Sequence, residues 1–232
     1  MSVMAKDNAF SPTAAFTAQR NTPGRGLLLA LIAICCALEV ILQLSDIGLL
    51  QPERLRGMAY EYGGFWPGLL KDWNPNYAVQ PYAMFVTYGF LHGGVIHLVI
   101  NMITLWSLGA AVILRVGLRG FCILYVASIF GGAVGYALLA PGLQPMVGAS
   151  GALFGLAGGL LAWMYVDRFT FEQGLLPVAQ AVALLIAFNL ILWWAMSGQL
   201  AWQTHLGGFI VGWITALLID PRPFSPETPS RT

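Results

Sequence analysis

Long apolar runs alternate with short polar connections along this chain, and the runs have the length of membrane spans. A helix needs about 20 mostly apolar residues to cross the hydrocarbon core of a bilayer. Six runs approach that length, at residues 26–45, 93–114, 119–140, 150–166, 174–196 and 204–219. The pattern therefore predicts an all-α polytopic membrane protein, a bundle of six transmembrane helices.

The fourth and sixth runs are short for a span, which indicates that the chain before each of them dips below the membrane surface as a loop. Irregular backbone is tolerated at that depth only inside protein or beside a wet cavity. This is a first indication of an internal aqueous site.

Composition agrees with a membrane protein and excludes some partners. The chain is 58% hydrophobic and 9% charged, whereas soluble domains average about 25% charged residues. The formal net charge of +1 argues against nucleic acid as a partner. The three cysteines all lie within apolar runs, so we expect no disulfide framework. The polar first 25 residues give no sign of a signal peptide.

The basic residues predict which way the spans point. Six spans place both tails on one side, and that side receives eight of the eleven Lys and Arg residues. These are Lys6, Arg20, Arg25, Arg115, Arg119, Arg168, Arg222 and Arg231. Because cytoplasmic segments carry the excess of basic residues, we expect both tails to be cytoplasmic.

We therefore divide the chain into a polar cytoplasmic tail at 1–25, a six-span core at 26–220 and a second cytoplasmic tail at 221–232. A long outer loop at 46–92 joins the first two spans and is rich in Trp, Tyr and Phe. Such a composition is typical of an element half-sunk among the lipid headgroups.

Strongly polar residues inside spans are costly and often functional. The second span carries His92, His97 and Asn101, the fourth begins with Ser150, and the sixth begins near His205. All three of these spans run from outside to inside. At about 1.5 Å per residue, the polar residues share one layer within roughly 10 to 15 Å of the outer surface.

Each of these residues also has a simpler explanation. A lone serine at a helix start is usually an N-cap, and buried His and Asn side chains often only join helices by hydrogen bonds. The glycines at 151, 155, 159, 208 and 212 form small-xxx-small patterns that bring helices together. Close packing is compatible with catalysis, because it would let Ser150 and His205 form a hydrogen bond.

The chemistry of these residues suits acyl transfer. A serine becomes a nucleophile beside a neutral imidazole, and an oxyanion is stabilised by free backbone N–H groups, an Asn amide or a His N–H. No carboxylate lies near Ser150 or His205 in sequence, so we expect a dyad and not a triad. Glu39, in the first span, is expected to pair with a polar group of a neighbouring span; tuning of the site is the weaker alternative.

Three motifs in order, "FLHGGVIHLVINM", "GASGALFG" and "HLGGFIVG", resemble those of the rhomboid family of intramembrane serine proteases. The resemblance covers residues 80–220 and implies a Ser150 nucleophile with His205 as general base. It further implies an oxyanion hole from His97, Asn101 and the Ser150 N–H.

The resemblance also implies supporting roles. His92 would serve the structure or retain water. Phe154, one helical turn after Ser150, would pack on the catalytic imidazole. Close contact between helices would occur at Gly151, Gly208 and Gly212. Many members carry a Trp-Arg pair in the outer loop where this chain has Ala83 and Met84, so the usual fixing of that loop is in doubt.

The resulting hypothesis is an endopeptidase that cleaves other membrane proteins in or near helix-weakening transmembrane segments, without metal or cofactor. The bilayer is its second partner, and a bacterial inner membrane, with the site toward the periplasm, is the expected location. Two alternatives stay open. One is a non-catalytic rhomboid-like protein that binds or escorts membrane helices, and the other is a transporter that uses the polar cluster.

Overall fold

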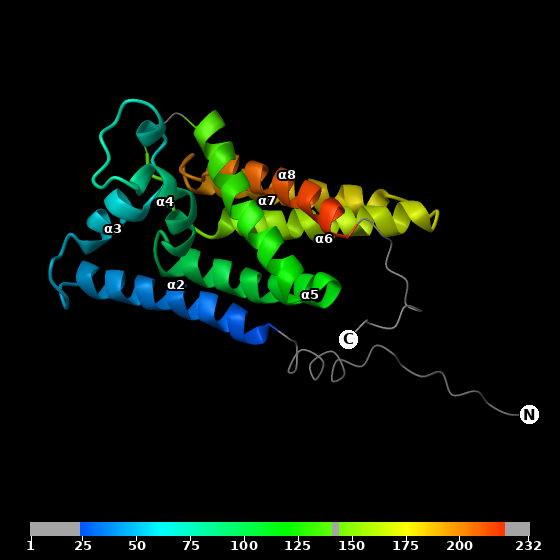
Figure 1. The fold of residues 1–232 in the computed structure, drawn as a ribbon, viewed down its shortest axis with the longest axis horizontal. Helices are drawn as coiled ribbons and strands as arrows, with labels where there is room; N and C mark the ends of the chain where they lie inside the picture. The colour runs from blue at the N-terminus through cyan, green and yellow to red at the C-terminus, as the bar shows by residue number, and fades with distance from the viewer. Residues whose placement is uncertain (1–23, 141–143, 221–232) are drawn as a thin grey trace, which may run out of the picture.

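The computed structural model describes residues 24–140 and 144–220, and these form an all-helical bundle without strands (Figure 1). The tails predicted at 1–25 and 221–232 lie almost wholly outside the described residues. The long helices are α2 (Arg25–Asp46), α5 (Val95–Leu139), α6 (Ser150–Thr170), α7 (Leu176–Ala195) and α8 (Trp202–Ile219). Their positions confirm the helices predicted from the apolar runs.

Four of these helices, α2, α5, α7 and α8, are long and apolar enough to cross a membrane, which indicates a multi-pass membrane protein. The 45-residue α5 covers both the second and the third predicted spans. It bends at Gly117, whose φ of 73° lies in the left-handed region that glycine tolerates. The bend turns its second half back, so that both ends of α5 lie at the same end of the bundle (Figure 1).

The connection between α2 and α5 folds into short helices at that same end. It contains α3 (Leu55–Gly63), η1 (Pro67–Leu70), α4 (Gln80–Thr87) and η2 (Tyr88–Phe90). Met84, one of the two residues that replace the expected Trp-Arg pair, is fully buried in this segment. The N-terminal ends of α6 and α8 lie close to these helices (Figure 1), so the segment covers the predicted site.

The core is formed by α6, α8 and the second half of α5, and glycines allow their backbones to touch. A Cβ atom at Gly208 would overlap the carbonyl oxygen of Gly151, and one at Gly212 would overlap that of Gly155. The close approach predicted from the small-xxx-small spacing is therefore present. It places the starts of α6 and α8 side by side.

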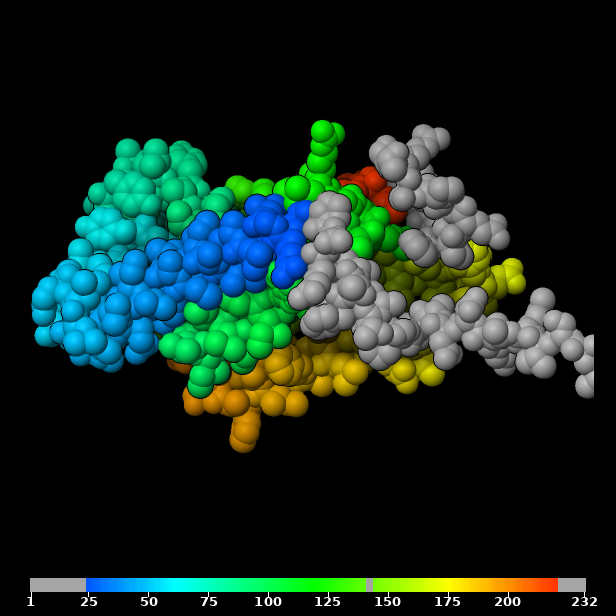
Figure 2. Space-filling model, turned by 90° about the horizontal axis from the view of Figure 1, so that it is seen from below, coloured from blue at the N-terminus to red at the C-terminus, as the bar shows by residue number. Residues whose placement is uncertain are grey.

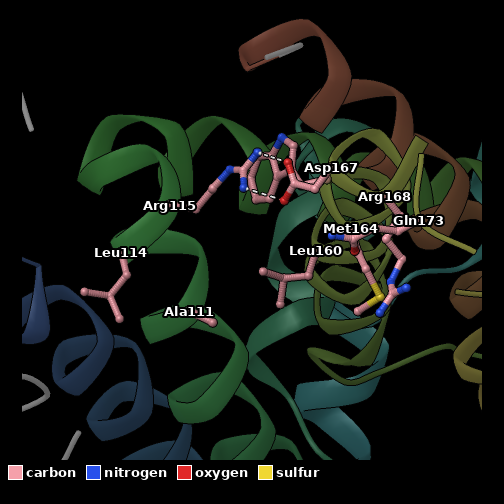
Figure 3. A pocket seen from close by; sticks show the side chains of 9 residues that line it. Ala111, Leu114, Arg115, Leu160, Met164, Asp167, Arg168 and Gln173 are labelled. Atoms are coloured by element: carbon pink, nitrogen blue, oxygen red, sulfur yellow. Dashed lines mark hydrogen bonds and ion pairs between the residues drawn. The ribbon is translucent and has the colours of Figure 1, made fainter. Parts of the chain in front are cut away.

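An ionic cluster holds the far end of the bundle, beside a cavity of about 550 Å³ (Figure 3). Arg115 donates two hydrogen bonds, 2.9 and 3.2 Å long, to the carboxylate of Asp167. Arg115 also lies 3.5 Å from a carboxylate oxygen of Asp220 and over the ring of Trp163. This cluster joins the bend of α5 to the last turn of α6 and to the end of α8.

Helix α7 packs loosely on this core. It forms one edge of the molecule in Figure 2, where it is coloured yellow to orange. Among its residues, all of which the structure describes, Val178 alone is buried. Most of its apolar side chains are therefore available to contact lipid or another helix.

Candidate active site

Three side chains from three helices form a hydrogen-bonded series at the covered end of the bundle. Ser150 Oγ lies 2.8 Å from Nε2 of His205, and Nδ1 of His205 lies 2.8 Å from Oδ1 of Asn189. An amide oxygen only accepts, so Nδ1 carries the ring proton and Nε2 is left to accept from the serine hydroxyl. This tautomer is the one that a general base for Ser150 requires.

Ser150 is the first residue of α6, and the loop before it is held by the α2–α5 connection. Phe65 and Met146 exchange two backbone hydrogen bonds of 2.9 and 3.0 Å, and the N–H of Gly148 donates to the carbonyl of Tyr88 at 2.9 Å. Because the first N–H groups of a helix have no partner within the helix, the Ser150 N–H is a donor at the site.

His205 lies in the first turn of α8 and is 4% exposed. The ring of Phe154 stacks on its imidazole, with 4.1 Å between centroids and 4° between planes. This is the contact that the family resemblance implied for Phe154. Stacking restricts the tilt of the imidazole, while Asn189 restricts its rotation about the ring axis, so together they aim Nε2 at Ser150.

Gly148 lies close to both His97 and Ser150. A Cβ atom at Gly148 would come within 3.0 Å of His97 Nε2 and within 3.8 Å of Ser150 Oγ. Gly148 has a φ of 127°, which other residues rarely adopt. The absence of a side chain here leaves the space between the serine hydroxyl and the imidazole of His97 open to a third group.

Asn101 is buried below His97 on the same helix, and its Nδ2 donates to the His97 carbonyl at 2.8 Å. That bond uses one of the two hydrogens of the Asn101 amide, and the second hydrogen can donate to another group. No contact joins Asn101 to Ser150 within the described residues. The structure therefore brings Ser150, His205 and His97 together, with Asn101 one turn deeper.

His92 packs beside His97, with 5.3 Å between ring centroids in an edge-to-face arrangement. It is 1% exposed, and neither ring nitrogen forms a hydrogen bond of good geometry with the described residues. Burial, and secondarily the neighbouring His97, lowers the pKa of His92 to about 4, so that its ring is neutral at pH 7.

A cavity of about 600 Å³ opens from the dyad toward α7. Its walls are mainly apolar, and Asn189 and His205 are the polar residues that reach it. A mainly apolar cavity that reaches His205, the hydrogen-bond partner of Ser150, is suited to an apolar peptide segment. Within residues 24–140 and 144–220, no group of three His, Cys, Asp or Glu residues is arranged to hold a metal ion.

Two residues of this site were missed by the sequence analysis. Asn189 is a strongly polar residue within a predicted span, and that isolation was the signal that could have identified it. Arg56 carries no such signal, because it lies in the α2–α5 connection. Glu39 was predicted to pair with a polar group of a neighbouring span, and this prediction was wrong. Its partner is Arg56 of α3, which donates two hydrogen bonds to the Glu39 carboxylate.

Comparison with known proteins identifies the family to which the helical core is similar. A family model described as the Rhomboid domain matches residues 80–222. RHOMBOID-like protein 4 of Arabidopsis thaliana is 35% identical over 134 residues, which are 58% of this chain and 33% of that protein. Rhomboid protease GluP of Bacillus subtilis (strain 168) is 34% identical over 126 residues, 54% of this chain and 24% of that protein.

A third relative is Rhomboid protein 1, mitochondrial, of Saccharomyces cerevisiae (strain ATCC 204508 / S288c). It is 33% identical over 137 residues, which are 53% of this chain and 38% of that protein. The chain thus spans well under half of the length of these curated relatives. The family model itself covers the residues from α4 to the end of α8, which include Ser150, Asn189 and His205.

Proposed function

Since the chain belongs to the rhomboid family, we propose that it is a serine endopeptidase that hydrolyses peptide bonds in or near the transmembrane helices of other proteins. The observation that carries this proposal is the hydrogen bond of 2.8 Å between Ser150 Oγ and His205 Nε2. A serine hydroxyl paired with an unprotonated imidazole nitrogen is the arrangement that nucleophilic acyl transfer needs.

In the first half of the reaction, Ser150 Oγ attacks the carbonyl carbon of the peptide bond while His205 Nε2 takes the hydroxyl proton. The imidazolium keeps its Nδ1–H on Asn189 Oδ1. The tetrahedral intermediate then collapses, His205 gives the proton to the departing amine, and an acyl ester remains on Ser150. Water, deprotonated by His205, hydrolyses the ester and restores the serine.

The oxyanion of the intermediate needs donors aimed at the place where its charge develops. The Ser150 N–H is one candidate, because it stands at the start of α6 without a partner in its own helix. The Nε2–H of His97 is the other, because that nitrogen borders the open space beside Gly148. Asn101 would be an additional donor through its second amide hydrogen. The supporting residues are Phe154, which packs on His205, and the glycines at 151, 208 and 212, which set the distance between α6 and α8.

We further propose that α5 crosses the bilayer twice and that α6, with 21 residues, crosses it once in addition to α2, α7 and α8, so that the bundle has six crossings. With six crossings, the excess of basic residues on one side favours cytoplasmic tails, and the dyad would then lie toward the opposite side. The relatives come from a bacterium, a plant and a yeast mitochondrion, so family membership does not select one compartment.

A substrate helix would reach Ser150 through the apolar cavity beside α7. A regular helix hides its peptide carbonyls within its hydrogen bonds, so the substrate must unwind locally before attack. We therefore infer that the substrates carry glycine, proline or polar residues that weaken the helix near the cleaved bond.

Labelling with a fluorophosphonate tests the proposal. The purified protein in lipid vesicles should be phosphonylated at Ser150, as mapped by mass spectrometry, and His205→Ala should abolish the labelling. Ser128→Ala is the control for a serine without a basic partner, because Ser128 is buried and donates to the carbonyl of Leu124. Failure of the wild-type protein to label would contradict the nucleophile and favour the non-catalytic alternative.

A further inference from the structure

Arg56 of α3 lies at the centre of a network that ties three segments together. Its Nη1 and Nη2 donate to the two carboxylate oxygens of Glu39 on α2, at 3.1 and 2.8 Å. Its Nε donates to Asp46 at 2.6 Å. Glu39 is 2% exposed, and hydrogen bonding to this carboxylate raises the pKa of Arg56 above its already high value. The guanidinium is therefore a fixed, charged group.

The same guanidinium reaches the start of α5. Arg56 Nη1 donates to the carbonyl oxygen of His92 at 3.1 Å, and the hydroxyl of Tyr60 donates to the same oxygen at 2.7 Å. This carbonyl belongs to the peptide group whose N–H is that of Gly93. The Gly93 N–H in turn donates to Nδ1 of His97 at 3.2 Å.

A planar trans peptide points its C=O and its N–H in opposite directions. Arg56 and Tyr60 therefore bind the C=O of the His92–Gly93 peptide group, and His97 accepts from the N–H on its opposite edge. A positive charge on the carbonyl side polarises the peptide and strengthens its N–H as a donor. The peptide group thus connects a buried ion pair to the imidazole of His97.

The hydrogen bond from Gly93 determines which nitrogen of His97 bears the proton. Because Nδ1 accepts, the ring proton of neutral His97 is on Nε2. Nε2 is the atom that borders the space beside Ser150. In the opposite tautomer, Nε2 would present a lone pair to a developing oxyanion and would repel it.

We propose that Arg56, fixed by Glu39, is a positioning residue for peptide hydrolysis, acting through the His92–Gly93 peptide to keep His97 in the Nε2–H tautomer. This inference rests on the proposed function. The alternative is that Arg56 only anchors α3 to α2.

The test uses the full-length protein in lipid vesicles and the double variant Glu39→Gln/Arg56→Gln, which removes both charges together and leaves no unpaired buried ion. Tyr60→Phe is a milder variant that removes one donor to the His92 carbonyl. Arg54→Gln is the matched control, because Arg54 is an exposed arginine two residues before Arg56. Thermal unfolding is recorded for each variant.

Cleavage of a single-span substrate gives the first readout. We expect kcat of the double variant to fall about 10- to 100-fold, with KM almost unchanged. This is less than the roughly 100- to 1,000-fold loss that follows removal of an oxyanion donor, because His97 still adopts the Nε2–H tautomer in part. Tyr60→Phe should lower kcat a few-fold, and Arg54→Gln should match the wild type. If the double variant does not fold, Tyr60→Phe decides: a kcat equal to that of wild type would overturn the proposal.

Nitrogen-15 NMR of the histidine rings gives the second readout, which does not depend on activity. The chain has three histidines, and a His92→Gln sample helps to assign the His97 signals. The wild-type protein should show His97 in the Nε2–H form, and the double variant should show a mixture of tautomers.

The two readouts separate the explanations. A lower kcat with an unchanged His97 tautomer would show that Arg56 has only a structural role. A changed tautomer with wild-type kcat would overturn the positioning role. If wild-type protein neither labels at Ser150 nor cleaves any substrate, the proposed function fails, whereas the NMR result still decides whether Arg56 controls His97.

Discussion

The hydrogen bond between His205 and Asn189 leads to a specific expectation about catalysis. Asn189 lies on α7, the most loosely packed long helix, yet its side chain contacts the buried imidazole of His205. The change Asn189→Leu keeps a similar volume and removes the acceptor for His205 Nδ1–H. We expect the imidazole to lose its preferred tautomer and orientation, and kcat to fall.

The structure sets the size of this effect. A hydrogen bond between uncharged groups contributes about 0.5–1.5 kcal/mol, and about 1.4 kcal/mol corresponds to a tenfold change in rate. The stacking of Phe154 persists in the variant and still restricts the ring. We therefore expect kcat to decrease about three- to tenfold, and not by the several orders of magnitude expected for loss of Ser150 or His205.

The assay is cleavage of a fluorescent single-span substrate in vesicles, with kcat and KM measured separately. Leu190→Ala is the control, since Leu190 is the next residue of α7 and lines the same cavity but carries no acceptor for the His205 Nδ1–H. A kcat for Asn189→Leu equal to wild type, or an equal loss in Leu190→Ala, would refute the role of the hydrogen bond.

Four further substitutions test other parts of the account. Gly208→Val should lower the unfolding temperature strongly, because its Cβ would overlap the Gly151 carbonyl, whereas Gly57→Ala, in open space, should leave it unchanged. Gly148→Ala should reduce kcat more than it alters KM, because its Cβ would lie 2.7 Å from His97 Cε1. Phe154→Leu should reduce kcat a few-fold to about tenfold, as expected from about 0.5–1.5 kcal/mol for an aromatic pair. Asp167→Asn should lower the unfolding temperature with kcat unchanged, because Asp167 is 17 residues, or about 25 Å along α6, from Ser150.

The helices and the principal side chains of the site follow from local features of the sequence. Apolar runs of span length predicted the long helices, since burial of backbone polar groups in a bilayer requires helices. The glycines at 208 and 212 predicted the close contact with α6, since only glycine allows such backbone overlap. Together these features place Ser150 beside His205.

The residues that orient the imidazoles depend on tertiary arrangement and could not be predicted in the same way. Asn189 is 16 residues before His205 on a different helix, so their hydrogen bond depends on how α7 and α8 come together in the fold. Arg56 is separated from His92 by 36 residues, and only the fold of the α2–α5 connection brings them together. The spacing of motifs predicts which groups would react, whereas the tautomers of the imidazoles depend on long-range contacts.

The fate of a transmembrane substrate tests the central claim most directly. The purified protein and a single-span substrate with a helix-weakening segment would be reconstituted together in vesicles, and the products sequenced by mass spectrometry. The account predicts one cleavage in or near the span, lost in both Ser150→Ala and His205→Ala. Undiminished cleavage by either variant would contradict it.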